Sequence, residues 1–144
     1  MISNYIVERL SEKYIKQYAE AVISDWYNEY QLNKYKGNMT IEQLSAAILK
    51  EKNYRYVIIK NNELIGGIAL IDDKYISYFI VPEYRNNGIA TDILKEFTKK
   101  VIETNYEVYI QIMKGNKASM RVGEKVGYSK ISENKLTVTL AYSR

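Results

Sequence analysis

The chain has 144 residues, of which 47% are hydrophobic and 26% are charged, and its formal net charge at pH 7 is +4. This is the size and composition of one soluble globular domain, so we expect a single domain over residues 1–144. The sequence contains no cysteine and no histidine. Disulfides, the Ser-His-Asp arrangement and the usual zinc ligands are thereby excluded, and no metal site is expected.

The sequence shows no feature of secretion or membrane insertion. The first residues lack a basic segment followed by a long apolar run, and no apolar stretch approaches about 18 residues. We therefore expect a cytoplasmic protein with no membrane partner. The positive charge could attract nucleic acid, but no run of Lys or Arg exceeds two residues. No nucleic-acid partner is expected, and a basic nucleic-acid-binding domain is the weakest alternative.

The first third of the chain predicts one strand and two helices. Residues 5–10 are typical of a strand, and Ser11 can cap a helix whose apolar residues recur at helical spacing as far as Trp26. A polar loop over residues 34–39 follows. Thr40 and Gln43 then fit a capping box at the start of a second helix.

Three strands joined by tight turns are predicted next. Residues 54–60 and 64–71 form a hairpin around Asn61-Asn62, and Asp72-Asp73 turns the chain again before a strand over residues 75–81. A helix then begins near Ile89, with apolar residues stacked at every fourth position. It is followed by a strand over 107–113, a helix over 116–126 and a closing strand over 136–142.

The segment VPEYRNNGIATDIL, residues 81–94, predicts a phosphate site. A strand ends at Pro82, a polar loop follows, and Gly88 stands where the next helix begins. N–H groups in the first turn of a helix have no intrahelical partner, and the helix dipole adds positive charge there. Gly88 allows a ligand to approach the backbone closely, and Arg85 adds a fixed charge. The loop lacks the GK[ST] of a P-loop and the three glycines of a dinucleotide fingerprint.

This loop resembles the acyl-CoA signature R/Q-x-x-G-x-G/A of the GCN5-related N-acetyltransferase (GNAT) superfamily, through Arg85, Gly88 and Ala90. A second segment, NKASMRVGEKVGY over residues 116–128, resembles the later motif of the same family. The residues that match it are Asn116, Ser119, Lys125, Gly127 and Tyr128. In motif style the chain is most similar to the branch that includes ribosomal-protein N-terminal acetyltransferases.

The resemblance implies a GNAT-type α/β fold. Such a fold has a mixed, twisted central sheet of about seven strands with four helices on its two faces, in the order β-α-α-β-β-β-α-β-α-β. Strands 75–81 and 107–113 should run parallel and splay apart, with the pantetheine arm between them. The donor would be acetyl-CoA, and the acceptor a small-molecule amine or the N-terminal amine of a protein or peptide. Transfer would be direct, in a ternary complex, by a monomer or homodimer. A non-catalytic acyl-CoA-binding module is the alternative.

The resemblance also implies a set of cofactor-binding residues at the strand end, in the loop and at the start of the last helix. Backbone groups of residues 79–81 should hold the acetyl end, and those of residues 86–91 should wrap the pyrophosphate. The full set is Phe79, Ile80, Val81, Arg85, Asn86, Asn87, Gly88, Ile89, Ala90, Thr91, Asn116 and Ser119.

Two catalytic positions differ from the family pattern. Where many relatives carry a tyrosine acid this chain has Gly123, so Ser119 is a candidate to stabilise or protonate the thiolate; a structural serine is the equal alternative. The strand position where relatives often carry a glutamate is uncharged. Tyr78, through a water chain, and Glu83 are then the candidate bases, although Glu83 could equally be a solvated loop charge.

The missing base bears on the acceptor. At pH 7 a lysine-like amine must lose its proton at a cost of about 4–5 kcal/mol, whereas an α-amine needs only about 1 kcal/mol. Without a carboxylate, the α-amine is the easier substrate. The acceptor pocket should form from residues 26–40 facing strand 75–81. Its aromatic residues are Trp26, Tyr27, Tyr30 and Tyr35, which either form a cation–π wall or pack a helix.

Overall fold

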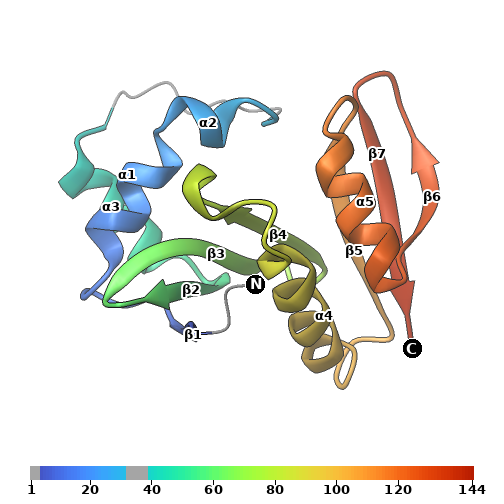
Figure 1. The fold of residues 1–144 in the computed structure, drawn as a ribbon, viewed down its shortest axis with the longest axis horizontal. Helices are drawn as coiled ribbons and strands as arrows, with labels where there is room; N and C mark the ends of the chain where they lie inside the picture. Colours follow the sequence, from blue (N-terminus) through green and yellow to red (C-terminus); the bar gives the residue numbers. More distant parts are fainter. Residues whose placement is uncertain (1–3, 32–38) are drawn as a thin grey trace.

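The computed structural model describes residues 4–31 and 39–144. The described residues contain seven strands, five α-helices and one 3-10 turn (Figure 1). The strands are β1 (Ile6–Arg9), β2 (Tyr54–Lys60), β3 (Glu63–Ile71), β4 (Tyr75–Ile80), β5 (Glu107–Met113), β6 (Ser129–Glu133) and β7 (Thr137–Ser143). The helices are α1 (Ile15–Val22), α2 (Asp25–Asn28), α3 (Ile41–Lys50), α4 (Ile89–Val101) and α5 (Lys117–Val126), and the 3-10 turn η1 is Pro82–Tyr84.

The strands form one sheet in the order β1-β2-β3-β4-β5-β7-β6. Every neighbouring pair is antiparallel except β4 and β5, which are parallel. The predicted mixed sheet is confirmed. Strand β6 is the additional strand of the closing hairpin, and every one of its residues is exposed, so no buried-and-exposed alternation marks it in the sequence.

Helices cover both faces of the sheet, as expected, because alternate residues of each strand point to opposite sides. Val57 and Ile59 of β2 pack with α1 and α3 in one buried cluster. Ile58 between them belongs to a second cluster with α4 and α5. Strand β4 divides in the same way. Phe79 contacts the first cluster, whereas Ile76 and Ile80 belong to the second.

The first predicted helix is in fact two helices. Helix α1 ends at Val22, and Ser24 begins α2 by accepting a hydrogen bond from the Tyr27 N–H at 3.3 Å. The apolar spacing continues through this break, which is why periodicity alone predicts one helix. Ser11 lies before the N-cap position of α1, which is Tyr14. The Thr40–Gln43 capping box is confirmed, with both of its hydrogen bonds formed.

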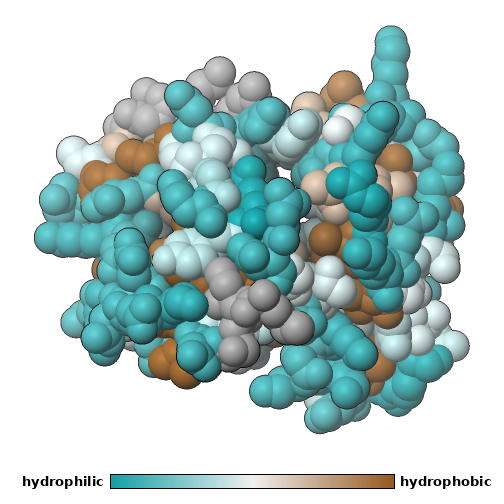
Figure 2. All heavy atoms as spheres, viewed as in Figure 1, coloured by the Kyte–Doolittle hydropathy of each residue, from teal (hydrophilic) through white to brown (hydrophobic). Residues whose placement is uncertain are grey.

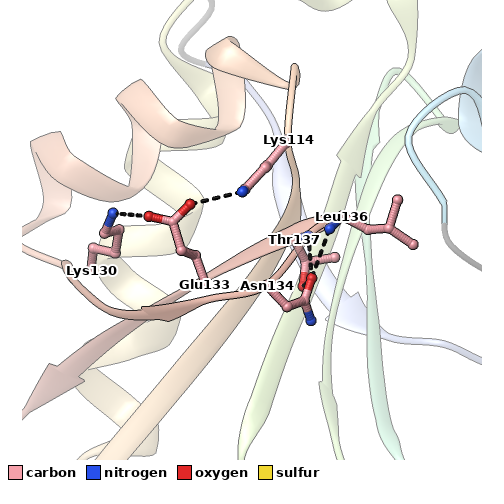
Figure 3. Close-up of polar contacts among 6 residues, drawn as sticks. All are labelled: Lys114, Lys130, Glu133, Asn134, Leu136 and Thr137. Carbon is pink, nitrogen blue, oxygen red and sulfur yellow. Dashed lines mark hydrogen bonds and ion pairs between the residues drawn. The ribbon is translucent and has the colours of Figure 1, made fainter.

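The hairpin of β6 and β7 holds the segment that leads from β5 to α5 (Figure 3). The Lys114 N–H donates to the Leu136 carbonyl at 2.8 Å, and the Lys114 ammonium lies 2.8 Å from the Glu133 carboxylate. Lys130 also pairs with Glu133, and these two lysines lower the pKa of Glu133 to about 2. The side-chain oxygen of Asn134 accepts hydrogen bonds from the N–H groups of Leu136 and Thr137, which closes the turn.

No helix among residues 4–31 and 39–144 is long and apolar enough to cross a membrane.

The core behind α4 and α5 contains a buried polar pair. The hydroxyls of Thr98 and Tyr128 lie 2.7 Å apart and form a hydrogen bond, and these two residues are 1% and 3% exposed. This pair fixes the end of α5 to α4.

We expect Tyr128→Phe to lower the free energy of unfolding by about 1–3 kcal/mol, because it leaves the Thr98 hydroxyl buried without its partner. Adding Thr98→Val should recover most of the loss, since an apolar pair of similar shape has no unsatisfied group. Tyr142→Phe is the control: its ring packs on Tyr128, but its hydroxyl has no partner among the described residues. Urea denaturation measures all four proteins, and equal losses for Tyr128→Phe and Tyr142→Phe would contradict this account.

Candidate active site

A cavity lies where β4 and β5 separate. The two strands share one register pair, Tyr75 with Tyr109, and the Tyr109 N–H donates to the Lys74 carbonyl at 2.9 Å. Beyond that point β4 stays paired with β3 and β5 with β7, so the gap between β4 and β5 widens (Figure 1). It opens into a cavity of about 410 Å³, a size typical of small-molecule sites. The surface between α5 and the rest of the molecule is hollowed and mostly hydrophilic (Figure 2).

Residues from five segments line this cavity. They are Trp26, Tyr27, Glu29, Tyr30 and Gln31 around α2; Ile76–Ile80 of β4; Arg85; Ile110–Met113 of β5; and Gly115–Ser119 at the start of α5. Arg85 from the first family-like segment and Asn116 and Ser119 from the second therefore line one cavity, although about thirty residues separate the two segments in the sequence. Residues 86–91 of the first segment do not line it.

Strand β4 directs part of its backbone into the gap. The Val81 N–H donates to the Ile65 carbonyl on β3 at 2.9 Å, so this group is engaged within the sheet. Because backbone groups alternate sides along a strand, those of Phe79 also point toward β3, and those of Tyr78 and Ile80 point into the gap. The expectation that residues 79–81 all present their backbone to a ligand is therefore corrected to Tyr78 and Ile80.

The loop before α4 has the geometry of an anion site. Gly88 is the N-cap of α4 in the left-handed region (φ 78°), and a Cβ built on it would have no atom within 4 Å. In the described part of the chain, the N–H groups of residues 86–91 donate to no protein acceptor; the first intrahelical bond is from the Asp92 N–H to Gly88 at 3.1 Å. These free donors lie at the positive end of the α4 dipole, so the loop fits the phosphates of a ligand.

Arg85 connects this loop to the rest of the cavity. Its Nε donates to the Ile80 carbonyl at 3.0 Å, and its guanidinium lies over the Trp26 ring at 5.5 Å. The side chain therefore faces the wall formed by α2 as well as the loop, whereas the sequence placed it only at the loop entrance.

Helix α5 begins at the opposite side of the gap. Asn116 is its N-cap, and the side-chain oxygen accepts the Ser119 N–H at 3.3 Å. This hydrogen bond uses the oxygen of the Asn116 amide. The side-chain NH₂ group remains available, because it has no acceptor among the described residues. Asn116 can therefore donate to a ligand in the cavity while it caps the helix.

Comparison with known proteins identifies the family. A family model described as an acetyltransferase (GNAT) domain matches residues 6–129. The chain belongs to the GNAT family. No curated protein is similar enough in sequence to count as a match.

Solved structures share the GNAT fold at low sequence identity. The spermidine N-acetyltransferase of Vibrio cholerae, in complex with CoA and spermine, is 13% identical with a TM-score of 0.82, covering 96% of this chain and 95% of that one. The ribosomal-protein-S5-alanine acetyltransferase of Vibrio fischeri is 13% identical with a TM-score of 0.83, covering 99% and 94%. An aminoglycoside acetyltransferase with coenzyme A and kanamycin is 11% identical with a TM-score of 0.74, covering 98% and 95%.

The GNAT site brings two of the predicted catalytic residues together. Tyr78 from β4 and Ser119 from α5 face each other across the gap. Burial raises the pKa of Tyr78, and the neighbouring Ser119 side chain partly opposes that rise. The Tyr78 hydroxyl is buried, yet it completes no hydrogen bond within the described residues. A protonated tyrosine beside a serine is an arrangement suited to giving a proton, not to removing one.

The structure explains why a GNAT tyrosine is absent at Gly123. A Cβ on Gly123 would lie 2.8 Å from Cδ1 of Leu140, which is 1% exposed on β7. Helix α5 therefore packs directly on the sheet at this point. A tyrosine there would have to displace the core.

The third predicted catalytic residue does not reach the cavity. Glu83 lies in the exposed turn η1 and does not line the site. The carboxylate that does line it is Glu29, at the C-cap of α2. Glu29 falls within the predicted acceptor segment, but a glutamate at a helix end is usually solvated, so the sequence held no signal for it. Tyr35, also predicted there, lies outside the described residues.

We expect Tyr78→Phe to raise the free energy of unfolding of the free protein by about 1 kcal/mol, because the substitution removes a buried hydroxyl without a partner. Urea denaturation measures the change in the free energy of unfolding. The same chemical change at Tyr128 should have the opposite sign, which makes the two variants controls for each other. A loss of stability in Tyr78→Phe would show that its hydroxyl is hydrogen-bonded in solution.

Proposed function

We propose that this chain is an acetyl-CoA-dependent N-acetyltransferase that transfers the acetyl group directly to a primary amine in a ternary complex. The observation that carries the proposal is the loop at residues 86–91. Its free N–H groups stand at the start of α4, directly after Arg85, which lines the cavity between β4 and β5. We further propose that residues 1–144 form one catalytic domain and that the protein acts in the cytoplasm as a monomer or homodimer.

The residues of the site fit acetyl-CoA at the pyrophosphate and along the pantetheine arm. The N–H groups of residues 86–91 suit the pyrophosphate, with Lys117 adding positive charge at the start of α5. The side-chain NH₂ of Asn116 and the inward backbone groups of Tyr78 and Ile80 suit the amide groups of the pantetheine arm. Acetyl-CoA supplies a thioester whose carbonyl carbon accepts the amine.

The groups around the reacting centre suit the negative charge that develops on the carbonyl oxygen and on the departing sulfur. An N–H of β4 that points into the gap can stabilise negative charge on the carbonyl oxygen. Tyr78, kept protonated by burial, can give its proton to the departing sulfur, and Ser119 can receive hydrogen bonds from Tyr78 or place a water there. Tyr78 is thus assigned as acid, although the sequence considered it as a base.

The acceptor is a small-molecule amine or the N-terminal amine of a protein or peptide. Solved structures with this fold carry the names of a spermidine, a ribosomal-protein and an aminoglycoside acetyltransferase, and amines are common to all three. The alternative, a non-catalytic acyl-CoA-binding module, is favoured only by Gly123 and the uncharged strand. Release of free thiol from acetyl-CoA, measured with polyamines, peptides and aminoglycosides, distinguishes the two. A non-catalytic module would bind acetyl-CoA but release no thiol.

A thermal-shift titration with acetyl-CoA tests the donor site. Acetyl-CoA at about 100 times its Kd should stabilise the protein by about 2.7 kcal/mol. Gly88→Glu should abolish the shift by setting bulk and negative charge against the phosphates. Gly88→Gln has the same bulk and the same backbone strain without the charge, so it should retain more of the shift. No shift in the unsubstituted protein would contradict the proposal.

Steady-state kinetics test the role of Tyr78 as the acid. Tyr78→Phe should lower kcat by about 10²–10⁴-fold, the usual contribution of general acid catalysis, while acetyl-CoA still stabilises the variant. Ser119→Ala should lower kcat by less, because it acts through Tyr78 or water. A kcat equal to that of the unsubstituted protein in both variants would show that the thiolate leaves without a protein acid.

A further inference from the structure

The charged residues that line the cavity come from three segments. Arg85 follows η1 and holds its guanidinium over the Trp26 ring at 5.5 Å, and Lys117 stands at the start of α5. Glu29 stands at the C-cap of α2, the helix that carries the aromatic lining residues. It is the one carboxylate among the described residues that line the cavity. The cavity therefore offers charge of opposite sign both to an anionic donor and to a cationic acceptor.

Helix α2 is short, but it is held firmly on the sheet. The rings of Trp26 and Tyr27 pack on Phe79 of β4, with ring centroids 5.9 and 5.3 Å apart. The Asn28 side-chain NH₂ donates to the carbonyls of Val22 at 2.9 Å and Ser24 at 2.8 Å. Gly67 on β3 makes this packing possible, since a Cβ there would lie 2.7 Å from the Phe79 ring. Glu29 thus extends from a fixed support.

The Glu29 carboxylate has no interaction partner in the part of the protein that the structure describes. It is exposed, and it forms no ion pair or hydrogen bond with any residue of the described chain. Trp26 and Tyr30 line the same cavity, and the Trp26 ring face already takes a cation, the Arg85 guanidinium at 5.5 Å. A carboxylate in a cavity that aromatic side chains also line is a favourable environment for an ammonium group.

We propose that Glu29 binds the ammonium group of the acceptor and takes its proton before transfer. This inference rests on the proposed acetyltransferase function and adds the residue that selects protonated amines. It replaces the base that the strand does not supply, and it removes the expected advantage of α-amines over more basic aliphatic amines.

The proton and bond changes balance. The ammonium gives one proton to the Glu29 carboxylate, and the neutral nitrogen forms a bond to the acetyl carbon. The bond from that carbon to sulfur breaks, and the sulfur leaves with the electron pair and takes a proton from Tyr78. The nitrogen loses its second proton to solvent, which leaves an amide and a free thiol. The Glu29 carboxyl group then gives its proton to water and the Tyr78 phenolate regains one, which restores both groups for the next cycle.

The decisive comparison is Glu29→Gln against Asp25→Asn, tested on the most active amine of the panel. Both variants replace an exposed carboxylate at α2 by its amide, but Asp25 does not line the cavity. At pH 7, Glu29→Gln should lower kcat/KM for the amine by about 10²-fold or more. Asp25→Asn should leave kcat/KM unchanged, and acetyl-CoA should stabilise both variants as it does the parent protein.

A pH series separates binding of an ammonium from a structural defect. An amine with a pKa near 10.4 is neutral in only about one molecule in 2,500 at pH 7 and in about two in seven at pH 10. The Glu29→Gln defect should therefore shrink steadily between these values. The other ionisable groups facing the cavity are Arg85, Lys117, Tyr27, Tyr30 and Tyr78; they are unchanged in the variant, so the ratio of the two proteins cancels their titration.

The results distinguish this inference from the proposed function. If the parent protein acetylates an amine and Glu29→Gln acetylates it equally well, the role of Glu29 is overturned and the acetyltransferase stands. A defect that is constant from pH 7 to pH 10 would also overturn the role of Glu29. If the parent protein binds acetyl-CoA but acetylates no amine, the proposed function itself fails.

Discussion

The separation of β4 from β5 is the constraint on which the rest of the site depends. A parallel pair held by one register contact leaves the backbone groups of Tyr78 and Ile80 without a strand partner, and of these groups the Ile80 carbonyl accepts the Arg85 Nε–H at 3.0 Å. The others require water or a ligand, because unpaired buried backbone groups are costly. The separation is possible because β4 remains paired with β3, and β5 with β7. Each half of the sheet is complete without the other, and the cost is confined to one edge.

The two faces of the sheet give the cavity two chemically different sides. Helices α4 and α5 begin at the open end of β4 and β5, so their N-terminal dipoles and free N–H groups face the same space. Helix α2 lies on the opposite face and brings aromatic rings and a carboxylate. Arg85 joins the sides through the Ile80 carbonyl and the Trp26 ring. A donor and an acceptor can therefore approach the gap from opposite directions and meet at Tyr78.

Several features could be predicted from local sequence because their causes are local. Thr40 and Gln43 cap α3 through their own neighbours, and Asn61 and Asn62 turn a hairpin with positive φ values of 51° and 63°. The loop at Gly88 is similar, since a glycine before an apolar helix specifies the left-handed residue and the free N–H groups together. The break between α1 and α2 was missed because the apolar period runs through it, and β6 because every residue of that strand is exposed.

The sequence by itself determined most of the helices and strands, the glycine loop before α4 and the family, because each depends on residues close together in the chain or on motifs of fixed spacing. Only the tertiary structure decided which side chains share the cavity. In that structure Tyr78 lies beside Ser119, and Glu29, not Glu83, lines the cavity. The packing of α5 on Leu140 explains the glycine at position 123. These outcomes depend on how far β4 and β5 diverge and on which face α2 packs, and no local pattern encodes either.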